Sequence, residues 1–336
     1  MNKSFISGAY EIMFYCIVNP SARSGNGKNI YNIFEEKCKT LGKPYKVVFT
    51  KGPGHAMSVV KKLTEKKIGE DSSEPINIVV MGGDGTLNEV ISGIQDFDRV
   101  RLGVVPLGSG NDFVRDLDFP KNPEDLIDRI LKEEVVRKLD IGNVHYDHMT
   151  KTFSRLHDER IASDRRFDVS AGIGFDAAVC EEALSSNTKN FLNRLGLGKL
   201  TYGSIAIRQI LHADQPSCDI ETDDNQHIHI DHLIFAAAMI HHYEGGGFKF
   251  APDADLQDGY FDLIAGGDMS TFRIFKALPL AFFGKHYGQK GIHHIRAKEI
   301  KIRTALPLWV HTDGEVLLKS DAITLTCLQQ KLSLLS

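Results

Sequence analysis

The sequence of 336 residues predicts an α/β domain built on a parallel sheet, followed by a mostly antiparallel β-sandwich domain. Up to about Asp140, short apolar runs alternate with stretches whose apolar residues recur every three to four positions, as in strands that alternate with helices. Beyond Asp140, strand-like runs follow one another, with helical interruptions only near 174–184 and 199–212. The alternation favours a sheet covered by helices, and the succession of strands favours a sandwich.

The expected elements follow in chain order. Residues 1–140 form the first domain and residues 141–319 the second. The strands of the first domain are expected at 12–18, 45–50, 76–81 and 102–105, and its helices are marked by Ile30 to Leu41, Ala56 to Leu63 and Leu87 to Ile94. The strand-like stretches of the second domain are 167–173, 217–222, 227–240 and 260–265.

A glycine-rich turn, Gly82-Gly83-Asp84-Gly85, joins the apolar strand 76–81 to the next helix. The free backbone N–H groups and the dipole of a helix N-terminus attract an anion such as phosphate, and glycine permits close approach and a positive φ. Asp84 would repel phosphate unless Mg²⁺, a ribose hydroxyl or another donor lies between them. The turn therefore predicts a site for a nucleotide with its metal.

Two further strands end in polar, glycine-rich loops, Asn19 to Lys28 and Pro106 to Arg115. In an open α/β sheet such loops lie together at one edge. The first loop misses the Walker pattern, because Ala22 and Asn29 stand where that pattern has glycine and Ser or Thr, which disfavours a P-loop NTPase. Leu107 likewise breaks the Gly-x-Ser-x-Gly pattern around Ser109, which disfavours a serine hydrolase.

With these three loops, the runs 169–176 and 245–262, and Asp313-Gly314-Glu315, the sequence resembles the diacylglycerol kinase catalytic-domain family of soluble bacterial lipid kinases, which is similar to sphingosine and ceramide kinases. The resemblance covers nearly the whole chain. It implies an NAD kinase/diacylglycerol kinase-like fold with ATP bound in the first domain and lipid in the second, and it allows the last strands, about 320–336, to return to the first domain. It implies these nucleotide-binding residues: Asn19, Thr50, Gly82, Gly83, Asp84, Gly85, Thr86, Leu87, Asn88, Ser109, Asn111 and Asp112.

The resemblance also implies catalytic roles for Glu315, Asp84 and Asp140. Glu315 corresponds to the glutamate proposed as general base on the lipid hydroxyl. Asp140 corresponds to an aspartate that links its loop to the nucleotide metal. From the residues alone, Asp313-Gly314 is typical of a solvated hairpin turn, and Asp140 equally fits a strand-end aspartate.

The run 250–262 carries four acidic residues in ten positions, without the spacing of an EF-hand. Chemistry alone favours a polar loop before a strand. The resemblance implies a structural Mg²⁺ here, held by one side-chain carboxylate and main-chain carbonyls at Asp255, Asp258 and Tyr260.

Composition restricts the class of protein. The net charge of −4 gives no reason to expect nucleic acid. Five scattered cysteines argue against a disulfide framework and a zinc site, and fit a reducing cytoplasm. The longest apolar run, 233–240, is far shorter than the ~20 residues of a spanning helix. No signal peptide is expected.

Two stretches are ambiguous. Residues 272–283 contain phenylalanines with basic neighbours, for which a core helix ended by Pro279 is favoured over an interfacial amphipathic helix. Residues 192–200 are a second candidate of this kind. The alternating His227, His229 and His232 are interpreted as exposed strand residues and not as a metal site.

The sequence thus predicts an ATP- and Mg²⁺-dependent lipid kinase that converts diacylglycerol to phosphatidic acid, is cytoplasmic, and acts peripherally at the inner membrane surface. The alternatives are an NAD kinase-like phosphotransferase and a nucleotide-sensing module without activity. The lipid alcohol itself and the oligomeric state, including a homodimer, stay open.

Overall fold

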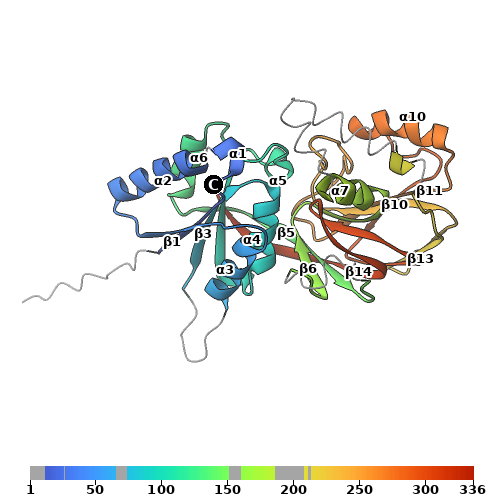
Figure 1. Cartoon of the computed structure of the whole chain (residues 1–336), viewed down its shortest axis with the longest axis horizontal. Helices are drawn as coiled ribbons and strands as arrows, with labels where there is room; N and C mark the ends of the chain where they lie inside the picture. The colour runs from blue at the N-terminus through green and yellow to red at the C-terminus, as the bar shows by residue number, and fades with distance from the viewer. Residues whose placement is uncertain (1–11, 26, 66–73, 151–159, 186–207, 211–212) are drawn as a thin grey trace, which may run out of the picture.

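The computed structural model describes residues 12–25, 27–65, 74–150, 160–185, 208–210 and 213–336 (Figure 1). Its helices are α1 (Ala22–Gly25), α2 (Gly27–Leu41), α3 (His55–Thr64), α4 (Asp84–Gly93), the 3₁₀ helix η1 (Phe97–Arg99), α5 (Asp112–Arg115), α6 (Pro123–Ile130), α7 (Phe175–Ser185) and α10 (Thr271–Phe282). Its strands are β1 (Phe14–Val18), β2 (Tyr45–Phe49), β3 (Ile76–Gly82), β4 (Val100–Pro106), β5 (Val135–Tyr146), β6 (Asp164–Phe167), β7 (Ser170–Gly174), β8 (Cys218–Thr222), β9 (His227–Ile230), β10 (Leu233–Met239), β11 (Phe261–Gly267), β12 (Ile292–Ala297), β13 (Glu299–Thr312) and β14 (Glu315–Leu335).

The N-terminal domain is a parallel sheet in the order β4-β3-β1-β2, as the alternation of strands and helices predicted. Every residue of β3 is buried, because helices cover both faces of the sheet. One face packs against α3 and α4, and the other against α2 and α6. The carboxyl ends of β1, β3 and β4 therefore bring the three glycine-rich loops to one edge.

The C-terminal domain is antiparallel, with β12-β11-β10-β7-β13-β14 as its main path. The predicted fold class is therefore confirmed. Residues 167–173 divide into β6 and β7, and residues 227–240 into β9 and β10, at short turns. The predicted helix at 199–212 and the amphipathic candidate at 192–200 fall almost wholly outside the described residues.

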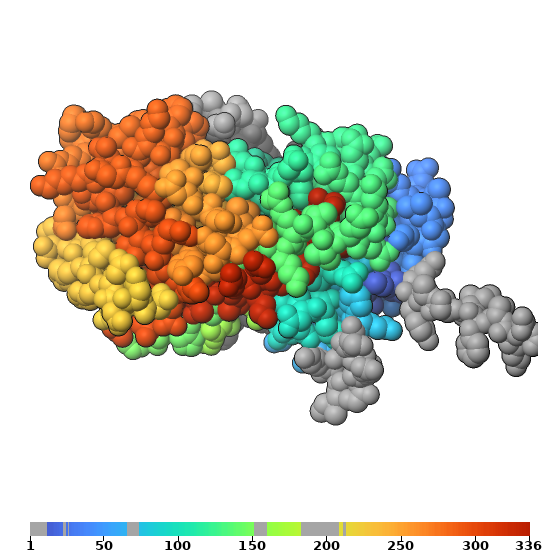
Figure 2. Space-filling model, turned by 180° about the vertical axis from the view of Figure 1, so that it is seen from behind, coloured from blue at the N-terminus to red at the C-terminus, as the bar shows by residue number. Residues whose placement is uncertain are grey.

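The 21-residue strand β14 joins the two domains. Its first half pairs with β13, and from Cys327 onward it pairs with β5. Ser333–Leu335 also lie parallel to β4 of the N-terminal sheet. The C-terminal end is accordingly marked inside the N-terminal domain in Figure 1, and C-terminal atoms show among that domain's atoms in Figure 2.

Candidate active site

The turn between β3 and α4 lies at the centre of the site, and α4 begins at Asp84. The expected positive φ is absent at Gly83, whose φ is −95°. Glycine is needed there for another reason: a Cβ on Gly83 would lie 3.1 Å from the Cα of Gly108, so the backbones of two loops are in contact. A Cβ on Gly82 would lie 2.7 Å from the Cβ of Thr86. The glycines therefore serve the packing of the turn itself.

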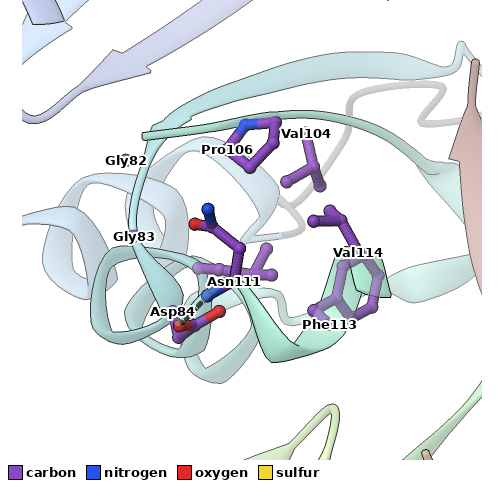
Figure 3. Close-up of a pocket in the computed structure, with 9 residues that line it drawn as sticks. Gly82, Gly83, Asp84, Val104, Pro106, Asn111, Phe113 and Val114 are labelled. Carbon is purple, nitrogen blue, oxygen red and sulfur yellow. Dashed lines mark hydrogen bonds between the residues drawn. The ribbon is translucent and has the colours of Figure 1, made fainter. Parts of the chain in front are cut away.

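Asp84 is the acidic group of this turn. Its Oδ2 accepts a hydrogen bond from the Asn111 N–H (2.8 Å) beside a small pocket, while the Asn111 side chain points away from Asp84 (Figure 3) and bonds to the backbone of Gly108. Burial, together with the charge of Asp112, raises the pKa of Asp84 to about 6. Both carboxylates lie near Gly110, whose Cβ would be 3.0 Å from Asp84 Oδ2 and 3.7 Å from Asp112 Oδ2.

The surroundings of these two carboxylates suit a divalent cation. Asp112 Oδ1 is buried and has no hydrogen-bond donor among the described residues, with Arg115 Nε 3.4 Å away. Two carboxylates beside a helix N-terminus, one with an oxygen that pairs with Arg115 but accepts no hydrogen bond, suit an ion that also binds phosphate. Asp84 and Asp112 would hold this metal.

The other predicted nucleotide residues divide into two groups. Asn19 reaches the turn, because its Nδ2 donates to Thr86 Oγ1 (3.2 Å). Thr50 follows β2 and is tied to β1 through Val18 (2.8 Å), and Ser109 is exposed at the tip of its loop. Leu87, in contrast, is 3% exposed and belongs to the core behind the turn.

Asn88 does not face the nucleotide edge. Its side chain is 1% exposed, and its Nδ2 donates to Asp313 Oδ2 (2.7 Å) while its Oδ1 accepts from Arg165 (3.0 Å). Both ends of the amide are thus bound by the C-terminal domain. The structure assigns Asn88 to the domain junction, which sequence could not show because its partners come from distant strands.

The turn Asp313-Gly314 brings Glu315 to this junction. Both turn residues have positive φ, 50° and 77°, and Thr312 pairs with Glu315, as in a two-residue hairpin of type I′. The Asp313 carboxylate accepts backbone hydrogen bonds from Asp168, Val169 and Ser170 at 2.9 to 3.0 Å. The hairpin interpretation is therefore confirmed for Asp313, but the turn is not simply solvated, because this carboxylate is bonded to the backbone and to Asn88.

Glu315 lies directly against the nucleotide turn. A Cβ on Gly85 would be 3.1 Å from Glu315 Oε1, and Arg160 Nη1 is 3.5 Å from Glu315 Oε2. The Glu315 side chain is 28% exposed, so it remains open to a ligand. The structure thus brings together Asp84 and Glu315, which are 231 positions apart in the chain.

A buried polar cluster behind this hairpin was not found from the sequence. His311 Nε2 lies 3.0 Å from Asp176 Oδ2 and 3.3 Å from Glu244 Oε1, and Ser170 Oγ donates to the same Glu244 oxygen (2.9 Å). Burial raises the pKa of Glu244 to about 7. Burial lowers the pKa of His311, but the carboxylates of Glu244 and Asp176 more than offset this and raise it to about 9.

Two more polar links join the domains near the site. Gly246 N–H donates to Asp112 Oδ2 (2.9 Å). Asp116, which is 4% exposed, accepts from the His242 N–H (2.7 Å) and lies 3.2 Å from Nδ1 of both His241 and His242. Although burial opposes it, the histidines hold the pKa of Asp116 well below its usual range.

Asp140 lies at the acidic loop. Its carboxylate, 1% exposed, accepts hydrogen bonds from the N–H groups of Gly259 and Gln330, both at 2.7 Å. These contacts tie the loop to a bend of β14, where Gln330 has a φ of 50°. The described bonds of Asp140 are therefore structural, and its catalytic role stays a prediction.

The predicted Mg²⁺ ligands of this loop are engaged by the protein. Asp258 pairs with Arg296 and accepts from the Tyr260 N–H (2.9 Å), and Asp255 accepts from the Gln257 N–H (3.0 Å). Within the described ranges, no group of three or more His, Cys, Asp or Glu side chains is arranged to hold a metal. The guanidinium of Arg296 pairs with Asp258 as placed, and the Mg²⁺ site, which would be held by one side-chain carboxylate and main-chain carbonyls, stays a prediction.

His227 and His229 are exposed on β9, as expected, and pair with Asp219 at 3.4 and 2.8 Å. His232 is exposed as well. None of the helices in the part of the chain that the structure describes is long and apolar enough to cross a membrane.

Comparison with known proteins decides the family. Residues 13–144 match the diacylglycerol kinase catalytic domain, and residues 169–336 match the YegS C-terminal NAD kinase beta sandwich-like domain. The chain belongs to the diacylglycerol kinase catalytic-domain family. The resemblance seen in the sequence is thereby confirmed. The first match covers the parallel sheet, and the second covers the antiparallel strands together with the end of β14 that returns to that sheet.

Individual relatives agree with this family. The chain is 29% identical over 315 residues to "Putative lipid kinase YtlR" of Bacillus subtilis (strain 168). The matched region covers 90% of this chain and 93% of the relative. It is 26% identical over 242 residues to a diacylglycerol kinase of the same organism, with 71% and 70% covered. A crystal structure of a "putative diacylglycerol kinase" from Bacillus anthracis str. Sterne superposes with a TM-score of 0.71 over 97% of both chains, at 23% identity, and supports the fold.

Proposed function

We propose that this member of the family is an ATP- and Mg²⁺-dependent kinase that phosphorylates the hydroxyl of diacylglycerol, acting from the cytoplasm at the inner membrane surface. The family supports a lipid kinase, and curated relatives bear the name diacylglycerol kinase. The observation that carries the proposal is the contact of Glu315 with Gly85, because it puts a partly exposed carboxylate beside the N-terminus of α4 and Asp84.

Each part of phosphoryl transfer has a candidate group. ATP would supply the γ-phosphoryl group, and Mg²⁺ would neutralise the charge that develops on it. The N-terminus of α4 would bind phosphate, with Asp84 and Asp112 holding the metal. Glu315 would take the proton of the lipid hydroxyl as its oxygen bonds to phosphorus and ADP leaves. Arg160 would orient Glu315.

The first experiment measures transfer of radiolabelled phosphate from ATP to a panel of diacylglycerol, sphingoid bases, other lipid alcohols and NAD. Incorporation into diacylglycerol is expected. Incorporation into NAD alone would favour the NAD kinase-like alternative, and binding of ATP without any transfer would favour the nucleotide-sensing module.

The second experiment tests Glu315. Glu315→Gln keeps shape and hydrogen bonding but loses basicity, so kcat is expected to fall by about 10²- to 10⁴-fold, or about 3 to 5 kcal/mol of barrier, with the KM for ATP nearly unchanged. Glu299→Gln, at an exposed position of β13, is the matched control and should keep wild-type turnover. A wild-type kcat in Glu315→Gln would require another base.

A further inference from the structure

All phenylalanines that are exposed in the described part of the chain gather on α10 and the residue after it. Phe272 is 79% exposed and Phe283 67%, with Phe282 and Phe275 at 47% and 38%. We call these four side chains the α10 surface. The favoured interpretation of a core helix was therefore wrong for this face. Ile274 and Leu278 of α10 pack inward, in a small apolar cluster that includes Ile234 of β10. Figure 1 shows α10 at the outside of the C-terminal domain, above β10 and β11.

The charged side chains of α10 and of the segment that follows it have one sign. From Thr271 to Lys290 the sequence contains no Asp or Glu, although the whole chain carries a net charge of −4. The same twenty residues contain Arg273, Lys276, Lys285 and Lys290. Exposed aromatic groups can enter the apolar acyl-chain region of a bilayer, and neighbouring cations can pair with anionic headgroups. This combination therefore complements an anionic lipid bilayer.

The α10 surface is continuous with the candidate active site. Phe282 contacts Phe248, with ring centroids 5.4 Å apart, and Phe283 at 5.2 Å. Phe248 belongs to the glycine loop 245–249, and Gly246 in that loop donates a hydrogen bond to Asp112 beside the nucleotide turn. A lipid held at the α10 surface would therefore lie beside the loop that borders the phosphoryl site.

We propose that the α10 surface docks the protein on a membrane that contains anionic phospholipid, with the phenylalanines inserted and the cations at the headgroups. This inference rests on the proposed lipid kinase function but names a surface that catalysis itself does not use. A second copy of the chain is disfavoured as the occupant, because two surfaces of the same positive charge would repel each other.

The test measures binding to sedimented vesicles of phosphatidylcholine with and without phosphatidylglycerol. Wild type is expected to bind the anionic vesicles and not the neutral ones. The variant Phe272→Gln/Phe283→Gln changes only well-exposed groups, and its vesicle affinity should fall by at least about tenfold. The variant Arg273→Gln/Lys276→Gln should lose the preference for phosphatidylglycerol. Leu41→Gln/Leu306→Gln, at 57% and 51% exposure elsewhere, is the matched control.

Vesicle binding needs no turnover, so it separates this inference from the proposed function. Binding by wild type that the phenylalanine variant loses supports docking even if no lipid is phosphorylated. Unchanged binding in that variant overturns it. Activity is also compared on vesicles and on a short-chain, water-soluble diacylglycerol. If the phenylalanine variant loses as much activity on the soluble substrate as on vesicles, these residues belong to the active site instead. If the wild type is a dimer without lipid and the variant is a monomer, the surface is an oligomer interface.

Discussion

Asp84 carries its charge where water reaches it poorly, beside Asp112 and close to Asp313. Its raised pKa records a free-energy cost of ionisation in the ligand-free fold. A bound cation would remove this cost. Asp84 thus makes the site suitable for a metal but lowers the stability of the ligand-free protein, as is common at functional sites.

Asp84→Asn is therefore expected to stabilise the protein and abolish phosphoryl transfer. Between the ordinary pKa of 3.8 and the folded value of about 6, the folded state binds more protons than the unfolded state, so wild-type stability falls as pH rises through this window. The variant should gain about 1 to 3 kcal/mol of unfolding free energy above about pH 7, and nothing near pH 3. Urea unfolding at several pH values measures this. Normal turnover in the variant, or a gain independent of pH, would contradict the assignment.

Single residues also show what the sequence could and could not reveal. The turn 82–88 was located correctly because strand, glycines and helix are adjacent in the chain. Glu315 was reached only through the family resemblance, since its contact with Gly85 depends on pairing between distant strands. His311 was missed for the same reason, although a histidine directly after the apolar stretch 306–310 is itself a signal of a buried polar partner.

At the scale of elements, the β13–β14 hairpin is held from both sides. Asp313 fixes it to the start of β7, and Gly314 N lies 3.3 Å from His311 Nδ1, which can accept its hydrogen bond when the imidazole is neutral. His311 is in turn held by Asp176 and Glu244, in a space that exists because residue 172 is glycine: a Cβ there would lie 2.5 Å from His311 Nε2. The element that carries Glu315 is thus positioned by the polar cluster behind it.

His311→Asn and His311→Gln separate positioning from mere packing. Asn keeps an acceptor near the place of Nδ1, for Gly314, whereas Gln keeps a donor near Nε2, for the carboxylates. Both variants should lower the melting temperature. The Gly314 bond forms only when the wild-type imidazole is neutral, which is above its pKa of about 9. If that bond orients Glu315, kcat measured above this pH should fall by at least about tenfold in His311→Gln and much less in His311→Asn, because small misplacements of a catalytic group are costly. Equal kcat in the two variants at equal folded fraction would leave His311 a packing role only.

At the scale of the whole molecule, the two domains share one sheet. β14 pairs with β13 in the C-terminal domain and with β4 in the N-terminal domain, and Asn88, Asp112 and Asp116 add side-chain links. The sequence showed that strands alternate with helices in the first part and follow one another in the second. It did not show that both parts share one sheet, because pairing of the last residues with β4 leaves no local pattern. The relative placement of the two halves of the candidate site therefore depends on β14 together with these side-chain links.

Leu334→Ala tests this continuity. Leu334 is fully buried in the N-terminal core at the end of β14, so the cavity should cost about 2 to 5 kcal/mol. Because the sheet is continuous, wild type is expected to unfold in one calorimetric transition, and the variant in one transition at a lower temperature. Leu41→Ala, at 57% exposure on α2, should change stability by less than about 0.5 kcal/mol. Two separate transitions, with only the N-terminal one shifted by Leu334→Ala, would show instead that the domains unfold independently and that β14 does not couple them.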